Sequence, residues 1–187
     1  DYIPDNQAAL NAALAGEVDA VTGFDANLKD QIEATGDFAL VTGASTDKGT
    51  LAFNQTSGPL ADQRVRQAIR QAIDHKALLD TCWAGRGKLI GSMVPPTDPL
   101  YEDLTSVAPY DLAKAKRLLA QAGYPNGIDV TLDAEGAFSE MAQAIGSLLT
   151  KAGIRTKVLV GEGSVIRTKW DPVKPKVGDM RLTSWGN

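Results

Sequence analysis

The chain has 187 residues, of which 43% are hydrophobic, and its formal net charge is -4. This length and composition can bury the core of a globular protein of one or two domains. The acidic balance and the scattered basic residues exclude the electrostatic footprint of a nucleic-acid-binding protein. No apolar run approaches the roughly 18 residues of a membrane span, so we expect a globular protein without a spanning helix.

The first quarter of the chain predicts two helices and several short strands. The first helix begins after Pro4-Asp5 and ends at Gly16, and a second is capped by Asp25 and runs through Ile32. Three short apolar runs are typical of strands: Val18–Thr22, Phe38–Val41 and Thr50–Phe53.

Two capped helices follow the break at Gly58-Pro59. Asp62 caps the first of them, and apolar residues then recur every three or four positions, at Val65, Ala68, Ile69, Ala72 and Ile73. Asp74 caps the second, which ends at Gly85 and carries an apolar stripe made of Leu78, Leu79 and Cys82. We therefore expect one face of each helix to pack on a core.

Two residues of the second helix have chemistry of their own. Cys82 is the only cysteine of the chain and lies on the apolar stripe, so we expect a buried core thiol. His75 is the only histidine, and its place beside Asp74 at the helix start predicts a solvent-exposed first-turn residue rather than a general base.

The second half of the chain predicts a loop, a helix and a βαβ unit. Pro95, Pro96 and Pro99 keep residues 89–99 irregular, and Asp111 caps a helix that Gly123 and Pro125 terminate. The βαβ unit consists of a strand, a helix and a second strand: Ile128–Leu132, Ser139–Ala152 and Ile154–Val160. Such a unit favours parallel strands and a mixed α/β sheet flanked by helices.

The C-terminal part is expected to be irregular over Gly161–Val177 and to form a last strand over Met180–Ser184. No set of histidines, cysteines or carboxylates has the spacing of a metal site. Gly161 and Gly163 lack the spacing of a nucleotide fingerprint. We therefore expect no enzyme, no cofactor and no metal, although a hydrolase with a carboxylate pair such as Glu135 and Glu140 stays open as an alternative.

Two stretches of this sequence resemble a known family. They are FNQTSGPLADQRVRQAIRQAIDHKALLD, which starts at Phe53, and PYDLAKAKRLLAQAGYPNGIDVTL, which starts at Pro109. With the Val94-Pro95-Pro96 loop between them, they are similar to the extracellular solute-binding proteins of the peptide and nickel class of ABC importers. The resemblance implies a periplasmic-binding-protein-like fold (type II, cluster C).

The resemblance also implies a division into lobes. Residues 1–55 would be the tail of a first lobe with one hinge strand, residues 56–180 a second lobe, and residues 181–187 the returning hinge strand. The rest of the first lobe would lie outside these 187 residues. The two hinge strands would then lie side by side and tether the lobes.

The ligand site that the resemblance implies lies between the lobes. Ligands bind outside the carboxyl ends of strands in open α/β sheets, and an indole at such an end offers a flat surface and one N–H donor. The expected ligand-binding residues are Trp185, Gly186, Asn187, Trp170, Arg167 and Asn54. The Arg167 guanidinium suits a peptide carboxylate because it can make two parallel hydrogen bonds.

The implied partners are a small solute and a membrane permease. The solute is expected to be an oligopeptide, a nickel chelate or a sugar, and the protein to be a monomer, with no nucleic acid bound. The implied location is the periplasm or the extracellular face of the cytoplasmic membrane, as in a lipoprotein. A ligand-sensing module on the same fold is the second alternative.

Overall fold

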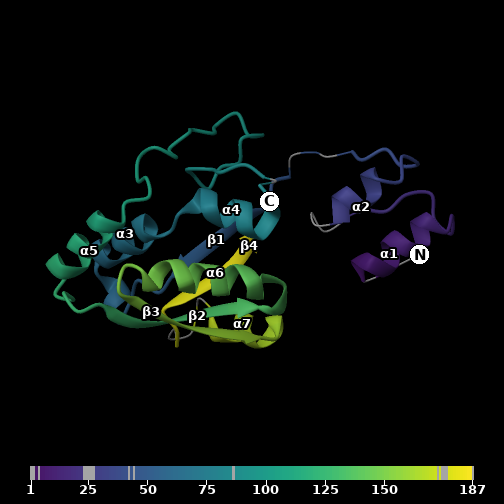
Figure 1. Cartoon of the computed structure of the whole chain (residues 1–187). Coiled ribbons are helices and arrows are strands. Elements are labelled where there is room, and N and C mark those ends of the chain that lie inside the picture. Colours follow the sequence, from purple (N-terminus) through teal and green to yellow (C-terminus); the bar gives the residue numbers. More distant parts are fainter. Residues whose placement is uncertain are drawn as a thin grey trace.

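The structure is a computed structural model that describes residues 3, 5–22, 28–41, 43, 45–85, 87–171, 173 and 177–186, with Lys29 described by its backbone alone. Figure 1 shows a body of sheet and helices, with an N-terminal helical segment beside it. In chain order the elements are α1 (Asn6–Leu14), α2 (Lys29–Glu33), β1 (Lys48–Phe53), η2 (Pro59–Ala61), α3 (Gln63–Ala72), α4 (His75–Trp83), α5 (Leu112–Gln121), β2 (Ile128–Glu135), η3 (Gly136–Phe138), α6 (Ser139–Thr150), β3 (Ile154–Gly161), α7 (Gly163–Lys169) and β4 (Met180–Trp185).

The body is built on a four-stranded mixed sheet in the order β1-β4-β2-β3. β2 runs parallel to β3 and to β4, whereas β1 is antiparallel to β4. The predicted βαβ unit is therefore confirmed, with α6 as its crossover. The fold class is the expected one, a mixed α/β sheet flanked by helices.

The first and last strands of the sheet are direct neighbours. Leu51 pairs with Leu182, and Phe53 pairs with Met180, although these residues are far apart in sequence. The expectation that the two crossing strands lie side by side is met. The division of the chain into lobes stays a prediction.

One face of the sheet carries the main core. Val130, Leu132 and Ala134 alternate along β2 on this face and are buried, and α3, α5 and α6 cover it. The core also takes the apolar stripe that the sequence predicted for α3, since Val65, Ala68 and Ile69 are fully buried. The periodic helices therefore pack on the sheet as expected.

Three predicted helix caps, Asp62, Asp74 and Asp111, are present, and Asp5 caps α1 in the same way. The carboxylates of Asp5, Asp62, Asp74 and Asp111 each accept a hydrogen bond from a backbone N–H in the first turn of α1, α3, α4 and α5 respectively. Their distances run from 2.8 to 3.0 Å. Asp25, the cap expected before α2, lies outside the described residues, and α2 begins only at Lys29.

The N-terminal segment buries a small apolar group of its own, formed by Ala9, Leu10, Ala12, Ala13 and Ile32. These residues do not belong to the main core. Figure 1 shows α1 and α2 apart from the sheet, joined to it by the chain that leads into β1.

Two strand predictions in this segment are wrong. Val18–Thr22 and Phe38–Val41 have no strand structure in the part of the chain that the structure describes. A strand requires a neighbour for its backbone hydrogen bonds, and no described strand lies beside either run. Val41, for example, is almost fully exposed.

Three further predictions need correction. Residues 163–169, expected to be irregular, form the short helix α7, because Ile166 and Trp170 bury themselves against the sheet. Cys82 is half-buried rather than a fully buried thiol. His75 is half-buried rather than solvent-exposed, since α4 lies on the edge of the core.

Candidate functional site

Three parallel strands end at the same edge of the sheet, which we call the carboxyl edge. β2 ends there at Glu135, β3 at Gly161 and β4 at Trp185. β1 is antiparallel and starts at this edge, because Lys48 pairs with Trp185. The carboxyl edge is therefore the place where an open α/β sheet presents a ligand site.

Trp185 is the most exposed aromatic side chain at this edge. It is 60% exposed, although it is the last residue of a strand whose Met180 and Leu182 are buried. Met180 and Leu182 face the core whereas Trp185 stands on the other face. The end of β4 is also open on both faces, since Ser184 is exposed as well. An indole in this position offers its flat face to a ligand.

Gly186 follows Trp185 and is tightly surrounded. A Cβ atom added to this glycine would collide with the carboxylate of Asp47. Asp47 is exposed, so its side chain could move aside for a larger residue at this position. Asn187 lies outside the described residues.

Glu135, the last residue of β2, lies between two arginines. Its Oε1 accepts a hydrogen bond of 3.3 Å from Nη2 of Arg181, in β4, and lies 3.6 Å from Nη1 of Arg167, in α7. Arg181 is mostly buried, whereas the side chain of Arg167 is 65% exposed. One exposed and one mostly buried guanidinium group thus surround this carboxylate. Arg181 itself lies near the start of β4, where it pairs with Asp133 and Ala52.

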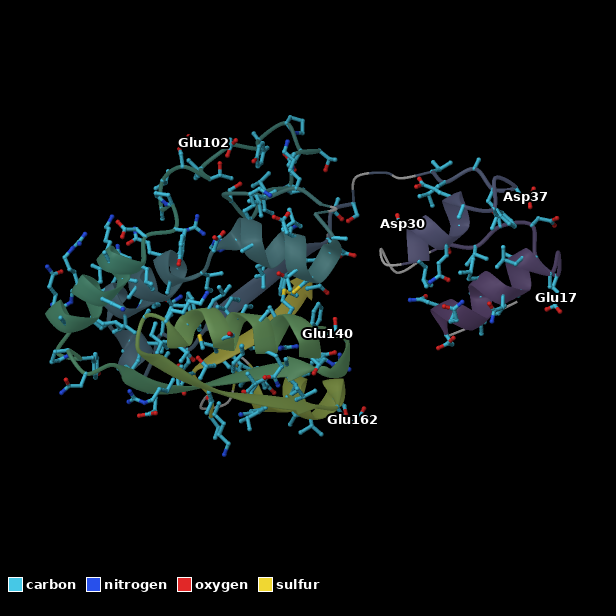
Figure 2. All side chains as sticks on the ribbon, in the orientation of Figure 1. Glu17, Asp30, Asp37, Glu102, Glu140 and Glu162 are labelled. Atoms are coloured by element: carbon cyan, nitrogen blue, oxygen red, sulfur yellow. The ribbon has the colours of Figure 1, made fainter. Side chains whose placement is uncertain are left out.

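Two further carboxylates stand at the same edge. Glu140 belongs to the first turn of α6, and Glu162 lies between β3 and α7. Figure 2 shows both at the side of the sheet where the strands end, and both are exposed. The site therefore carries charges of both signs.

Trp170 is buried and makes a structural hydrogen bond inside the protein. Its Nε1 donates a hydrogen bond of 2.8 Å to Oδ2 of Asp133, and Nζ of Lys169 lies 2.7 Å from Oδ1 of the same carboxylate. Asp133 is fully buried, so its charge requires both partners. This group fastens the end of α7 to β2.

Titratable residues elsewhere in the described chain do not converge into a site. Burial lowers the pKa of His75, and the positive charge of Arg70 adds to the effect. Burial raises the pKa of the Cys82 thiol, and the nearby charge of Glu140 acts in the same direction. No group of three potential metal ligands is found in the described ranges, and no helix in them could cross a membrane.

Comparison with known proteins identifies the family. Residues 1–187 match the family described as bacterial extracellular solute-binding proteins, family 5 Middle. The chain belongs to this family. Its identification therefore agrees with the resemblance of the two sequence stretches.

Two curated relatives of this family 5 member are similar over much of its length. Di/tripeptide-binding protein 1 of Pseudomonas aeruginosa (strain UCBPP-PA14) is 31% identical over 140 residues, which are 71% of this chain and 26% of that protein. Heme-binding protein A of Haemophilus influenzae is 33% identical over 126 residues, 64% of this chain and 23% of that protein. The chain spans about a quarter of the length of these relatives, which are binding proteins rather than enzymes.

A solved structure shares the fold. DppA of Helicobacter pylori, an ABC transporter-associated periplasmic binding protein in complex with the peptide STSA, superimposes with a TM-score of 0.77 and 28% identity. The match covers 99% of this chain and 36% of that chain.

The structure of the family 5 member brings only some of the expected site residues together. Trp185, Gly186 and Arg167 lie at the carboxyl edge. Asn54 follows the opposite end of β1, six residues from Lys48, which is roughly 20 Å at the usual rise of a strand.

Asn54 makes structural contacts at that opposite end. Its side-chain amide donates to the carbonyl of Gly178 and to Oγ of Ser57, and its Oδ1 accepts from the backbone N–H and the hydroxyl of Thr56. These bonds join the end of β1 to the chain that enters β4. Ligand roles for Asn54 and for the buried Trp170 stay predictions.

Sequence reasoning named Arg167 but missed Arg181, the second arginine that contacts Glu135. Glu135 and Arg181 are 46 positions apart, and nothing in the local pattern joins them. A signal was present in β2, where polar side chains alternate with apolar ones: Asp129, Thr131, Asp133 and Glu135. This alternation predicts a second, polar face of the sheet. Ion pairs such as those of Glu135 are expected on a polar face.

Proposed function

We propose that this family 5 member is the solute-binding component of an ABC import system. It would capture a peptide-like solute between two lobes and deliver it to a membrane permease. The observation that carries the proposal is the exposed indole of Trp185 at the carboxyl edge, since a large exposed aromatic ring at a strand end is suited to ligand contact.

Three further observations support it. The chain belongs to a family of extracellular solute-binding proteins. One relative is named for di- and tripeptides, and DppA of Helicobacter pylori holds the peptide STSA. The name of another relative refers to heme, so a peptide is the first solute to test and not the sole one.

The proposed mechanism is closure of two lobes. Residues 56–180 would form one lobe, and the paired strands β1 and β4 would be the connections about which it turns. A ligand that touches both lobes stabilises the closed form through the contacts that the open form lacks. The closed form would then dock on the permease, and ATP hydrolysis would take place in other subunits.

The proposal includes the setting in which the protein acts. We place it in the periplasm or on the extracellular face of the cytoplasmic membrane, as a monomer without catalytic activity. Of the expected ligand contacts it uses Trp185 and Gly186, at the end of β4, and Arg167, in α7.

The test is calorimetric titration of the full-length protein with three groups of ligands: di- and tripeptides, nickel chelates and oligosaccharides. We expect one group to bind without turnover. Trp185→Ala should weaken binding at least tenfold, or about 1.4 kcal/mol, because the indole wall is lost, and Trp185→Phe should restore most of the affinity.

A matched control is Tyr110→Ala, which removes another exposed aromatic ring outside the carboxyl edge. It should leave binding unchanged. Product formation from any ligand would favour the hydrolase alternative with Glu135 and Glu140. If none of the three groups of ligands binds, a ligand-sensing module would be favoured.

A further inference from the structure

A pocket lies at the end of the sheet opposite to the carboxyl edge. Its volume is about 450 Å³, and residues from 116–127 and 150–153 line it, where α5 and α6 end and β2 and β3 begin. We call it the α5–α6 pocket. Because β2 is eight residues long, the pocket lies roughly 23 Å from the carboxyl edge at the usual rise of a strand. Its volume is in the range of small-molecule sites.

Backbone contacts fix the walls of the α5–α6 pocket. The N–H of Tyr124 donates to the carbonyl of Leu119 at 2.8 Å, and the N–H of Gly127 donates to the carbonyl of Tyr124 at 3.0 Å. Gly127 has a φ of +83°, and a Cβ atom added to it would collide with the carbonyl oxygen of Gly153. The two walls therefore meet through backbone alone, and a pocket formed in advance saves a ligand the cost of ordering it.

Part of the lining is apolar. Leu119 and Ala152 belong to the buried core, and the half-buried Tyr124 packs against the same core. The Tyr124 hydroxyl has no hydrogen-bond partner in the part of the chain that the structure describes, and it is not fully buried. The pocket thus offers apolar surface to the body of a ligand and one hydroxyl group beside it.

The polar part of the lining is basic. Lys116, in α5, and Lys151, which follows α6, are both exposed and line the pocket. Neither ammonium group has an ion-pair partner among the described residues, and no described carboxylate lines the pocket. Asp129 lies nearby in sequence, but Nε and Nη2 of Arg155 bind its two oxygens, each at 2.7 Å. Two positive charges therefore share the pocket without a counter-charge.

The helix dipole explains only one of these two lysines. Lys151 is the residue directly after α6, where a cation is favoured by the partial negative charge of the helix end. Lys116 is the fifth of the ten residues of α5, too far from the end for this effect. The chain as a whole has a net charge of -4, so unpaired cations that line one pocket run against its overall balance.

We propose that the α5–α6 pocket binds a small organic phosphate, namely a phosphate monoester with a short apolar body. Such a group carries a charge of about -1.5 to -2 at neutral pH, which matches two ammonium groups. Lysine binds phosphate as a point charge, and the amide of Asn126, which also lines the pocket, can donate a further hydrogen bond. The apolar body would lie against Leu119 and Tyr124. This inference goes beyond the proposed function and does not rest on it, because the carboxyl edge takes no part.

The test is calorimetric titration of the full-length protein with phenyl phosphate. We expect the wild-type protein to bind it, and Lys116→Gln and Lys151→Gln each to weaken binding at least tenfold, as expected for loss of a hydrogen bond to a charged group. Phenol, which has the ring without the phosphate, should not bind measurably. Inorganic phosphate should bind more weakly than phenyl phosphate, because it lacks the apolar body.

Two matched variants leave the α5–α6 pocket intact. Lys157→Gln removes an exposed lysine of β3 that does not line the pocket, and Trp185→Ala changes the other end of the sheet. Both should keep the affinity of the wild-type protein for phenyl phosphate. Thermal unfolding of each variant checks that it is folded. If Lys151→Gln does not fold, Lys116→Gln decides the matter, since this lysine is exposed and unpaired among the described residues.

Vesicles separate two sources of the phosphate group. Co-sedimentation with phosphatidylcholine vesicles that contain phosphatidic acid, lost in Lys116→Gln, would assign the phosphate to a lipid headgroup. Binding of phenyl phosphate without co-sedimentation would assign it to a soluble compound.

Three results would overturn the proposal. They are no binding of phenyl phosphate at millimolar concentration, equal affinities of Lys116→Gln and Lys157→Gln, and loss of binding in Trp185→Ala, which would place the phosphate at the carboxyl edge. Each of them leaves the solute-binding function untouched, because that function is measured with other ligands.

Discussion

The indole N–H of Trp170 donates to a carboxylate oxygen of Asp133 at 2.8 Å, between residues 37 positions apart. Both side chains are buried, and the bond joins the end of α7 to β2. Trp170 therefore has a structural role beneath the sheet surface, whereas Trp185 is exposed at the end of β4.

Trp170→Phe should destabilise the protein by about 1–3 kcal/mol, because the change leaves one oxygen of the buried Asp133 without its donor. Urea unfolding followed by circular dichroism measures the difference. Trp185→Phe, on an exposed ring, is the control and should change stability little. Equal unfolding midpoints for Trp170→Phe and the wild-type protein would show that the bond is not a stabilising one.

Leu132→Ala should cost roughly 2–5 kcal/mol, since it leaves a cavity in the core. Leu132 is fully buried in the central strand β2 and pairs in register with Val158 of β3 and Met180 of β4. Val160→Ala, on a half-exposed residue of β3, should cost much less. Chemical denaturation compares the two, and a similar loss for both would contradict the assignment of the core face.

Asp111→Ala should lower the stability by about 1 kcal/mol through loss of the cap of α5. The Asp111 carboxylate accepts a 2.8 Å hydrogen bond from the backbone N–H of Lys114. Asp111→Asn keeps an equivalent acceptor and should recover most of the loss. If the alanine and asparagine variants unfold at the same urea concentration, the cap is not what stabilises α5.

The stability of the protein should depend on the protonation of His75. Its pKa in the folded protein is lowered by burial and by the charge of Arg70, so the unfolded chain binds the proton more readily. The contribution is fully present above the unfolded pKa of about 6.5. It is lost as the pH falls below that value and through the lowered native pKa.

His75→Gln removes this titration and should flatten the change in unfolding free energy between about pH 5 and about pH 7.5. Urea titrations at the two pH values measure the slope. Arg70→Gln should reduce the slope in part, because only the smaller of the two causes is removed. A slope in His75→Gln equal to that of the wild-type protein would assign the dependence to other groups.

Much of the body of the fold could be predicted from the sequence, because its signals are local. An aspartate before an apolar periodic run marks a helix start, and Asp62 and Asp111 do cap α3 and α5. The alternation of Ile128–Leu132 marks β2, although the strand extends to Glu135. These signals are read within a few residues of one another.

Other elements could not be predicted, because a distant neighbour decides them. Val18–Thr22 has the composition of a strand but no described partner strand. Residues 163–169 show no clear hydrophobic periodicity. They nevertheless form α7, because Ile166 and Trp170 are buried where this helix packs on β2. Local propensity is a weak predictor wherever tertiary contacts outweigh it.

The candidate site divides in the same way. Trp185 could be expected from its place at the end of a predicted strand, whereas its exposure depends on what the end of β4 packs against. Glu135, Arg167 and Arg181 come from three separate elements. The pairing of β4 with β2 and the packing of α7 on β2 bring them together.

By itself, then, the sequence determined the capped helices, the βαβ unit and the likeness to a solute-binding family, since each depends on residues close together along the chain. The tertiary structure alone decided that Trp170 is buried while Trp185 is exposed, and that two arginines share one carboxylate oxygen. The reason is physical: burial and ion pairing depend on distances in space, which are set only when β1, β4, β2 and β3 assemble into one sheet.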